Sequence, residues 1–125
     1  MTVAHVCIVV SLFIPLACSW YAKWSVKGYD GHSPRLFLAT LTGRQQRANF
    51  AQQNFYETFP AFAVGVLVAH SLHATQGLID GLAVFWVAVR IAYALVYIAD
   101  NHPLRSTTWT LSFLTIIALY VIGAF

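Results

Sequence analysis

Apolar residues along the chain gather into four long runs that are separated by short polar connections. The runs cover about residues 3–22, 47–70, 81–100 and 105–125. Each is close to the roughly 20 residues that an α-helix needs to cross about 30 Å of hydrocarbon. The sequence therefore predicts a single domain, residues 1–125, that is an all-α membrane protein built as a bundle of four transmembrane helices. We interpret the first run as a membrane span, with a kink at Pro15, because no basic segment precedes it as in a signal peptide.

Composition and charge agree with a membrane protein and exclude two other classes. Hydrophobic residues make up 59% of the chain and charged residues 9%, whereas a soluble domain has about 25% charged residues. The net charge is +3, but five of the seven Lys and Arg lie between Lys23 and Arg47. No dense basic surface of the nucleic-acid-binding kind is encoded. The positive-inside rule predicts that the loop 23–43 faces the cytoplasm and that both termini face the other side, the periplasm if the membrane is a bacterial inner membrane.

The second run keeps polar residues at positions where a lipid-facing helix would be apolar. Asn54 and Glu57 lie on one helical face, and Pro60 follows one turn later and predicts a kink. A charge at the bilayer centre costs at least about 2.5–3.5 kcal/mol on insertion scales. Such residues are kept where they face protein, water or a ligand, so Glu57 is a candidate functional residue. The amides alone could equally join helices by hydrogen bonds.

The two charges inside the spans are predicted to lie at the same depth. Glu57 is eleven residues from the start of its span near Gln46, about 16 Å at 1.5 Å per residue. Arg90 is ten residues from the end of its span near Asp100, about 15 Å by the same rise. Opposite charges in such a medium should pair, directly or through one bridging group. The pair either lines a polar groove that Tyr93 and Tyr97 share, or it only fixes the helix register.

Three strings of the sequence resemble one known family. AQQNFYETFP, RIAYALVY and PLRS are similar to segments of the membrane-associated proteins in eicosanoid and glutathione metabolism, the MAPEG family, in a bacterial-type form. The resemblance implies a homotrimer of four-helix protomers, with glutathione held between neighbouring protomers near the cytoplasmic side. The positions that match glutathione contacts of the family, together with the nearby cation of the second helix, are Arg47, Gln52, Asn54, Glu57, Arg90, Tyr93 and Tyr97.

The resemblance also assigns two catalytic positions and shows one departure. Arg105 matches the arginine that holds the glutathione thiolate, and Ser106 matches a serine that follows it in some members. A guanidinium favours the thiolate, which is the reactive form of a thiol. Many enzymatic members carry an arginine four residues before the Asn, and here that residue is Phe50. Arg47, one turn nearer the cytoplasm, could replace it, or could contact lipid phosphate or the loop.

Three functions follow as hypotheses. The first is a glutathione-dependent transferase or peroxidase that acts on hydrophobic electrophiles or lipid hydroperoxides dissolved in the membrane. The second is a non-catalytic lipid-binding member of the same family. The third is a small proton-coupled multidrug exporter in which Glu57 alternates between a proton and a cation, although Arg90 at the same depth argues against it. No metal site is expected, because His70 and His73 have no third ligand nearby in the sequence.

Overall fold

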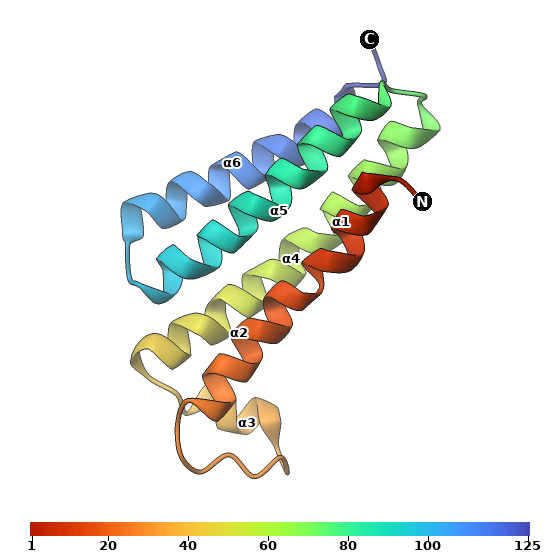
Figure 1. The fold of residues 1–125 in the computed structure, drawn as a ribbon. Coiled ribbons are helices and arrows are strands. Elements are labelled where there is room, and N and C mark those ends of the chain that lie inside the picture. Colours follow the sequence, from red (N-terminus) through yellow and green to blue (C-terminus); the bar gives the residue numbers. More distant parts are fainter.

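The computed structural model describes all 125 residues, and every regular element is an α-helix. Figure 1 shows two long pairs of helices, α4 beside the first span and α5 beside α6, with the short α3 at one end of the molecule. The element bounds are α1 (Val3–Ser11), α2 (Phe13–Trp24), α3 (Pro34–Ala39), α4 (Gly43–Ser71), α5 (Gln76–Ile98) and α6 (His102–Val121).

The first predicted span is one membrane-length segment with an interruption. The helix is broken at Leu12, and α1 and α2 together form a candidate span from Val3 to Trp24. Pro15 has no N–H to donate to the carbonyl of Ser11, and its ring crowds that carbonyl. The kink that we predicted at Pro15 is therefore an interruption one turn before it.

The turns between the long helices follow from local residues. α4 ends before His73 and α5 ends before Asp100, and both residues adopt the left-handed conformation, with φ of 56° and 62°. A residue in this conformation is a common way to end a helix. Asn101 then begins α6, because its side-chain oxygen accepts a hydrogen bond from the N–H of Leu104 at 3.1 Å. Because these turns are short, α5 runs antiparallel to both α4 and α6.

The loop after α2 contains a helix that the sequence analysis did not predict. Residues 27–33 are irregular, but α3 follows them and begins with Pro34, whose fixed φ suits the first helical turn. Leu38 and Leu41 pack with Ala22 and Ala48, so this segment buries apolar side chains against α2 and α4. The irregular part of the loop therefore ends where these apolar residues find neighbours to pack against.

Three segments are long and apolar enough to cross a membrane: Val3–Trp24, Gln76–Ile98 and His102–Val121. The predicted span 47–70 lies inside α4, which is the longest helix at 29 residues and runs through Pro60 without a break. The charges and amides of its first half make α4 less apolar than the other three segments.

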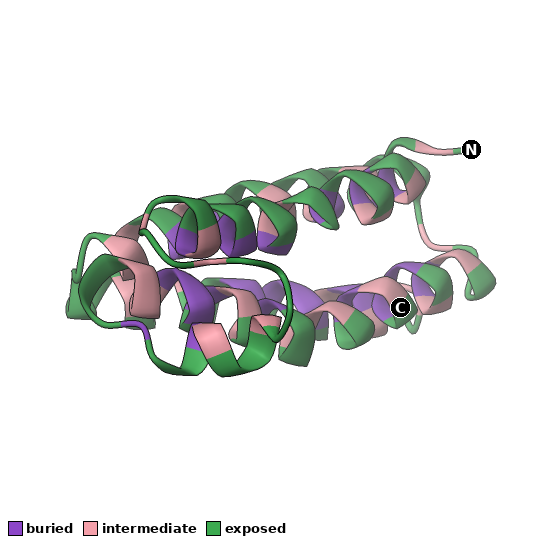
Figure 2. Ribbon diagram, turned by 90° about the horizontal axis from the view of Figure 1, so that it is seen from below, coloured by how far each residue is buried: buried purple, intermediate pink, exposed green.

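The core contains buried side chains from α1, α4, α5 and α6. At its centre Phe62 stacks on Trp86, with ring centroids 3.8 Å apart and planes 4° from parallel. Val66, Ile79 and Leu119 are fully buried beside them. Figure 2 shows buried residues turned toward the interior of the bundle and exposed residues over its outer surface. The core occupies the half of the bundle that contains the termini, so the opposite half is left for the polar side chains described below.

Asp80→Ala is expected to destabilise the protein by about 1–2 kcal/mol, because Asp80 joins the first helix to α5. Its carboxylate accepts hydrogen bonds from the backbone N–H of Ala4 and from the Gln76 side chain, both at 2.8 Å. The measurement is unfolding in mixed detergent micelles followed by circular dichroism. The control is Asp30→Ala, which removes an exposed loop carboxylate whose partner is His32. Equal stability of the two variants would show that the contact contributes nothing.

Candidate functional site

A polar row crosses from α4 to α5 in the interior of the bundle. Arg90 is only 1% exposed, and its Nη2 donates to Oδ1 of Asn54 at 2.9 Å. Asn54 in turn donates from Nδ2 to Oε2 of Glu57 at 3.3 Å. The predicted pairing of Glu57 with Arg90 is confirmed as a contact through one bridging group, the amide of Asn54. Helix geometry made this possible, because residues three apart on α4 lie on neighbouring positions of one face.

Aromatic rings surround the buried guanidinium of Arg90. Its carbon Cζ lies 4.3 Å from the ring centroid of Tyr93, and the rings of Trp86 and Phe55 lie within 6 Å. Electron-rich ring faces attract a cation, and the attraction is stronger where water is excluded. Nη1 also reaches Oγ of Ser112 on α6 at 3.5 Å, whereas Nε has no partner. Arg90 is therefore held mainly by one amide oxygen and by the face of Tyr93.

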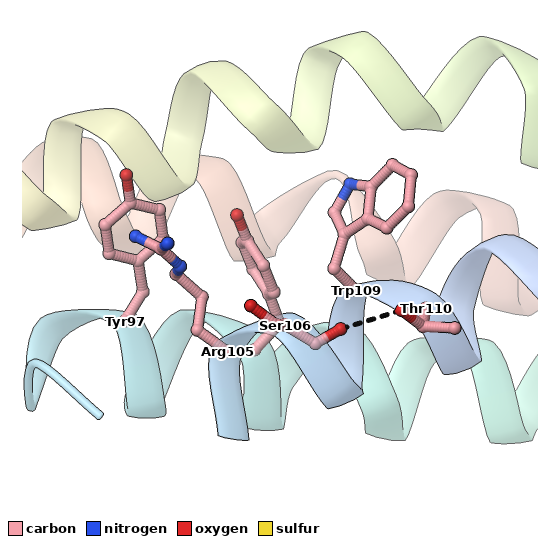
Figure 3. A pocket seen from close by; sticks show the side chains of 6 residues that line it. Tyr97, Arg105, Ser106, Trp109 and Thr110 are labelled. Carbon is pink, nitrogen blue, oxygen red and sulfur yellow. Dashed lines mark hydrogen bonds between the residues drawn. The ribbon is translucent and has the colours of Figure 1, made fainter. Parts of the chain in front are cut away.

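The row continues into an open hollow between α5 and α6, of about 350 Å³. Tyr93 meets Tyr97 edge to face at 5.6 Å, and the guanidinium of Arg105 lies 4.9 Å from the ring centroid of Tyr97. Figure 3 shows Arg105 extending toward Tyr97, with Ser106, Trp109 and Thr110 along the same helix. Arg105 is half-buried and has no hydrogen bond to its guanidinium and no carboxylate partner. Its charge is free to meet an anion that enters the hollow.

Gln52 and Arg47, two of the predicted ligand-binding residues, lie outside this row. Gln52 is two residues from Asn54, about 200° around the helix, and lines a second hollow of about 580 Å³ between α3 and α4. Its side-chain oxygen Oε1 is buried without a partner. Arg47 donates from Nε to the carbonyl oxygen of Ile98 at 3.0 Å, at the end of α5 where helix carbonyls lack partners. Within one chain these two residues do not meet the others.

Comparison with known protein families shows which family the chain belongs to. The MAPEG family model matches residues 3–125, nearly the whole chain. The chain belongs to the MAPEG family. MAPEG proteins generally use glutathione as a substrate or cofactor, and membership together with three span-length helices makes this MAPEG protein an integral membrane protein. No curated protein and no solved structure gives a significant match.

Several residues of this MAPEG protein contact the site without having been predicted in it, among them Trp109 and Ser112. Trp109 lines the hollow, and Ser112 contacts Arg90. Both follow Arg105 at helical spacing, at four and seven residues, so they share its face of α6. Their spacing from Arg105 could therefore have identified both residues in the sequence. Only the packing of α6 against α4 and α5 shows that this face, and not another, meets the polar row.

The charges of the row limit which molecules this MAPEG protein can hold there. Glu57 is exposed at the outer edge of the row, and its carboxylate can accept hydrogen bonds from an ammonium group. Arg105 can hold an anionic group in the hollow. The two tyrosines between them supply hydroxyl groups and ring faces. Family membership is consistent with membrane glutathione-related transferase or peroxidase roles and with lipid-binding roles.

Proposed function

We propose that this MAPEG protein is a membrane-embedded, glutathione-dependent transferase or peroxidase that acts on hydrophobic electrophiles or lipid hydroperoxides. The observation that carries the proposal is the continuous row from Glu57 through Asn54, Arg90, Tyr93 and Tyr97 to Arg105, which ends in the open hollow. In this proposal Arg105 and Ser106 are catalytic. The glutathione-binding residues are Arg47, Gln52, Asn54, Glu57, Arg90, Tyr93 and Tyr97.

Arg105 has the chemical role that the reaction needs most. A thiol such as that of glutathione titrates near pH 8.5, so about 3% is thiolate at pH 7. The unpaired guanidinium of Arg105 favours the anion, and the proton leaves to solvent. With an aryl halide, the sulfur forms a bond to the ring carbon while the bond from carbon to halogen breaks and halide departs. Ser106, exposed beside Arg105, can donate a hydrogen bond to the sulfur.

We further propose that three copies assemble and that α4 is the fourth span. Glu57, at mid-span depth, and Gln53, one turn nearer the cytoplasm, are exposed on the single chain, where lipid would leave a charge and an amide unsatisfied. A neighbouring copy that covers this face removes that cost. Assembly would also explain why Gln52 lies outside the polar row. The hollow between α3 and α4 that it lines would supply the second half of a glutathione site to the adjacent copy.

A non-catalytic lipid-binding role is the second candidate, and Phe50 favours it. The Phe50 side chain is 39% exposed and lines the hollow between α3 and α4, at the position where many enzymatic members carry an arginine. This substitution removes one cation that would hold a carboxylate of glutathione. The two functions differ in turnover, because a lipid-binding member would form no conjugate.

The experiment that tests the proposal is a conjugation assay with detergent-purified protein, glutathione and a generic aryl halide, with a lipid hydroperoxide assay beside it. We expect formation of conjugate or reduction of hydroperoxide above the uncatalysed rate. No turnover in either assay, with protein that remains folded, would favour the lipid-binding role. Phe50→Arg is then the variant in which activity should appear. Uptake of a cationic dye driven by a proton gradient would instead support the exporter.

A reporter fused after Phe125 should be active outside the cytoplasm, because the basic loop 23–43 is retained inside. The expected arrangement in a bacterial host is an inner-membrane protein with both termini in the periplasm. Paired alkaline phosphatase and green fluorescent protein fusions show on which side of the membrane the C-terminus lies. A fusion in the loop at His32 is the control, and it should report the cytoplasmic side. Fluorescence from the fusion after Phe125 would contradict this topology.

A further inference from the structure

An apolar groove separates α2 from α5 on the outside of the bundle. Its volume is about 710 Å³, which is within the usual range for small-molecule sites. Every side chain that lines it is apolar or aromatic except one, Arg44. The groove belongs to neither of the two polar hollows.

The break in the first span explains why this groove exists. α1 packs against α5, whereas after the break at Leu12 the helix α2 packs chiefly against α4. The two helices α2 and α5 are therefore not in close contact along the groove. Cys18 and Ala94 form its floor, where they pack with Ala51 of α4.

The groove and the candidate catalytic hollow share no lining residue and lie on different faces of α5, although Tyr93 of the hollow packs with Cys18 and Ala94 of the groove floor. Ile91, Leu95 and Ile98 line the groove and follow one another at four and three residues, which places them on one helical face. Tyr93 and Tyr97 line the hollow and lie about 200° around the helix from Ile91 and Leu95. A molecule in the groove would therefore not compete with one in the hollow.

The length of the groove matches one leaflet of a membrane. Val10 and Tyr21 mark its two ends along the first span, and eleven residues of helix rise about 16 Å. Half of a bilayer's hydrocarbon core is about 15 Å. An acyl chain that runs from mid-membrane to the headgroup level would fill the groove along its length.

Arg44 lies at the headgroup end and has no partner in the protein. Its side chain is exposed and forms no hydrogen bond or ion pair. It belongs to the first turn of α4, where Thr42 makes no side-chain hydrogen bond to the helix start. Free backbone N–H groups and the helix dipole at this end both favour an anion. The charge of Arg44 therefore complements an anionic headgroup above an apolar groove.

We propose that the groove between α2 and α5 is a binding site for an anionic phospholipid. One acyl chain lies along the groove, and the phosphate contacts Arg44. The leaflet that faces the cytoplasm carries anionic lipids, and basic residues near its surface attract them. The proposal does not depend on glutathione chemistry, because the groove and the hollow are separate.

The test is native mass spectrometry of the detergent-purified full chain, incubated with equal amounts of phosphatidylglycerol and phosphatidylcholine. We expect the wild type to retain one lipid per chain, with about fivefold preference for phosphatidylglycerol, the factor that one basic side chain near a membrane surface provides. Arg44→Ala should lose the preference. Ala17→Trp, which fills the groove from an exposed position, should lose retention of both lipids.

Two control variants distinguish this site from general surface effects. Lys27→Ala removes an exposed cation outside the groove, and Ala88→Trp adds the same bulk at an exposed site of α5 outside the groove. Both should retain lipid as the wild type does. The proposal is overturned if the wild type retains no lipid, if Ala17→Trp retains as much as wild type, or if Lys27→Ala loses the preference as fully as Arg44→Ala. The first outcome is the one expected if a second copy of the chain fills the groove.

Discussion

Asn54→Leu is expected to destabilise the protein by about 3 kcal/mol, because it removes the amide that holds a buried charge. Arg90 is almost completely buried, and its hydrogen bond to the Oδ1 atom of Asn54, at 2.9 Å, is the shorter of its two hydrogen bonds. After the substitution, Arg90 keeps the face of Tyr93 and the longer contact to Ser112. Neither contact replaces the shorter hydrogen bond to Asn54 for a desolvated cation.

The double variant Asn54→Leu/Arg90→Met should be more stable than Asn54→Leu alone, because no charge is then left unpaired. The free energy of unfolding can be measured in mixed detergent micelles for the two single variants and the double variant. Gln53→Leu is the matched control, since Gln53 is an exposed neighbour on α4 that makes no hydrogen bond to Arg90. If the cost of the double variant equals the sum of the single costs, Asn54 and Arg90 do not interact.

Arg105→Ala should lower glutathione turnover at pH 7 by about tenfold, the effect of raising the pKa of the bound thiol by one unit. The direction follows from the charge: removing a cation disfavours the thiolate, so less of the nucleophile is present at neutral pH. Raising the pH forms the thiolate without help, so the deficit should shrink as the pH approaches 9. Arg105→Lys should be intermediate, because lysine keeps the charge but loses the planar fork.

A pH–rate profile with an aryl halide, for wild type and both Arg105 variants, measures this effect. Lys27→Ala serves as the control for a general loss of positive charge, since Lys27 is exposed in the loop after α2. Equal rates for all variants at pH 7 would remove Arg105 from the mechanism. A deficit that stays constant from pH 7 to pH 9 would show that Arg105 acts on binding or structure and not on the thiolate.

The contact between Glu57 and Arg90 could be predicted from the sequence because two constraints are independent of detailed packing. Helix rise fixes the depth of each residue, and a charge in a membrane span needs a partner. The bridging role of Asn54 required the structure, because it depends on how far apart α4 and α5 lie. The placement of Glu57 at the exposed edge of a single chain, and not beside Arg90, also depends on that separation.

Other parts of the site could not be predicted because tertiary contacts determine them. Arg47 donates a hydrogen bond to the carbonyl oxygen of Ile98 at the end of α5, and nothing in its local sequence predicts that partner. Gln52 lies on the far side of α4 from Asn54, which helix geometry alone implies, yet the use of that face depends on α3. α3 itself forms because Leu38 and Leu41 find apolar neighbours in α2 and α4.

Calorimetric titration of glutathione into the detergent-purified protein tests the central claim most directly. A glutathione site should give saturable binding within the millimolar range, and Glu57→Gln should weaken it, because the ammonium then loses its carboxylate. Gln76→Ala, a change at the opposite end of the bundle, should leave it unaltered. No heat of binding up to millimolar glutathione, with folded wild-type protein, would contradict the account and leave lipid binding as the function of this MAPEG protein.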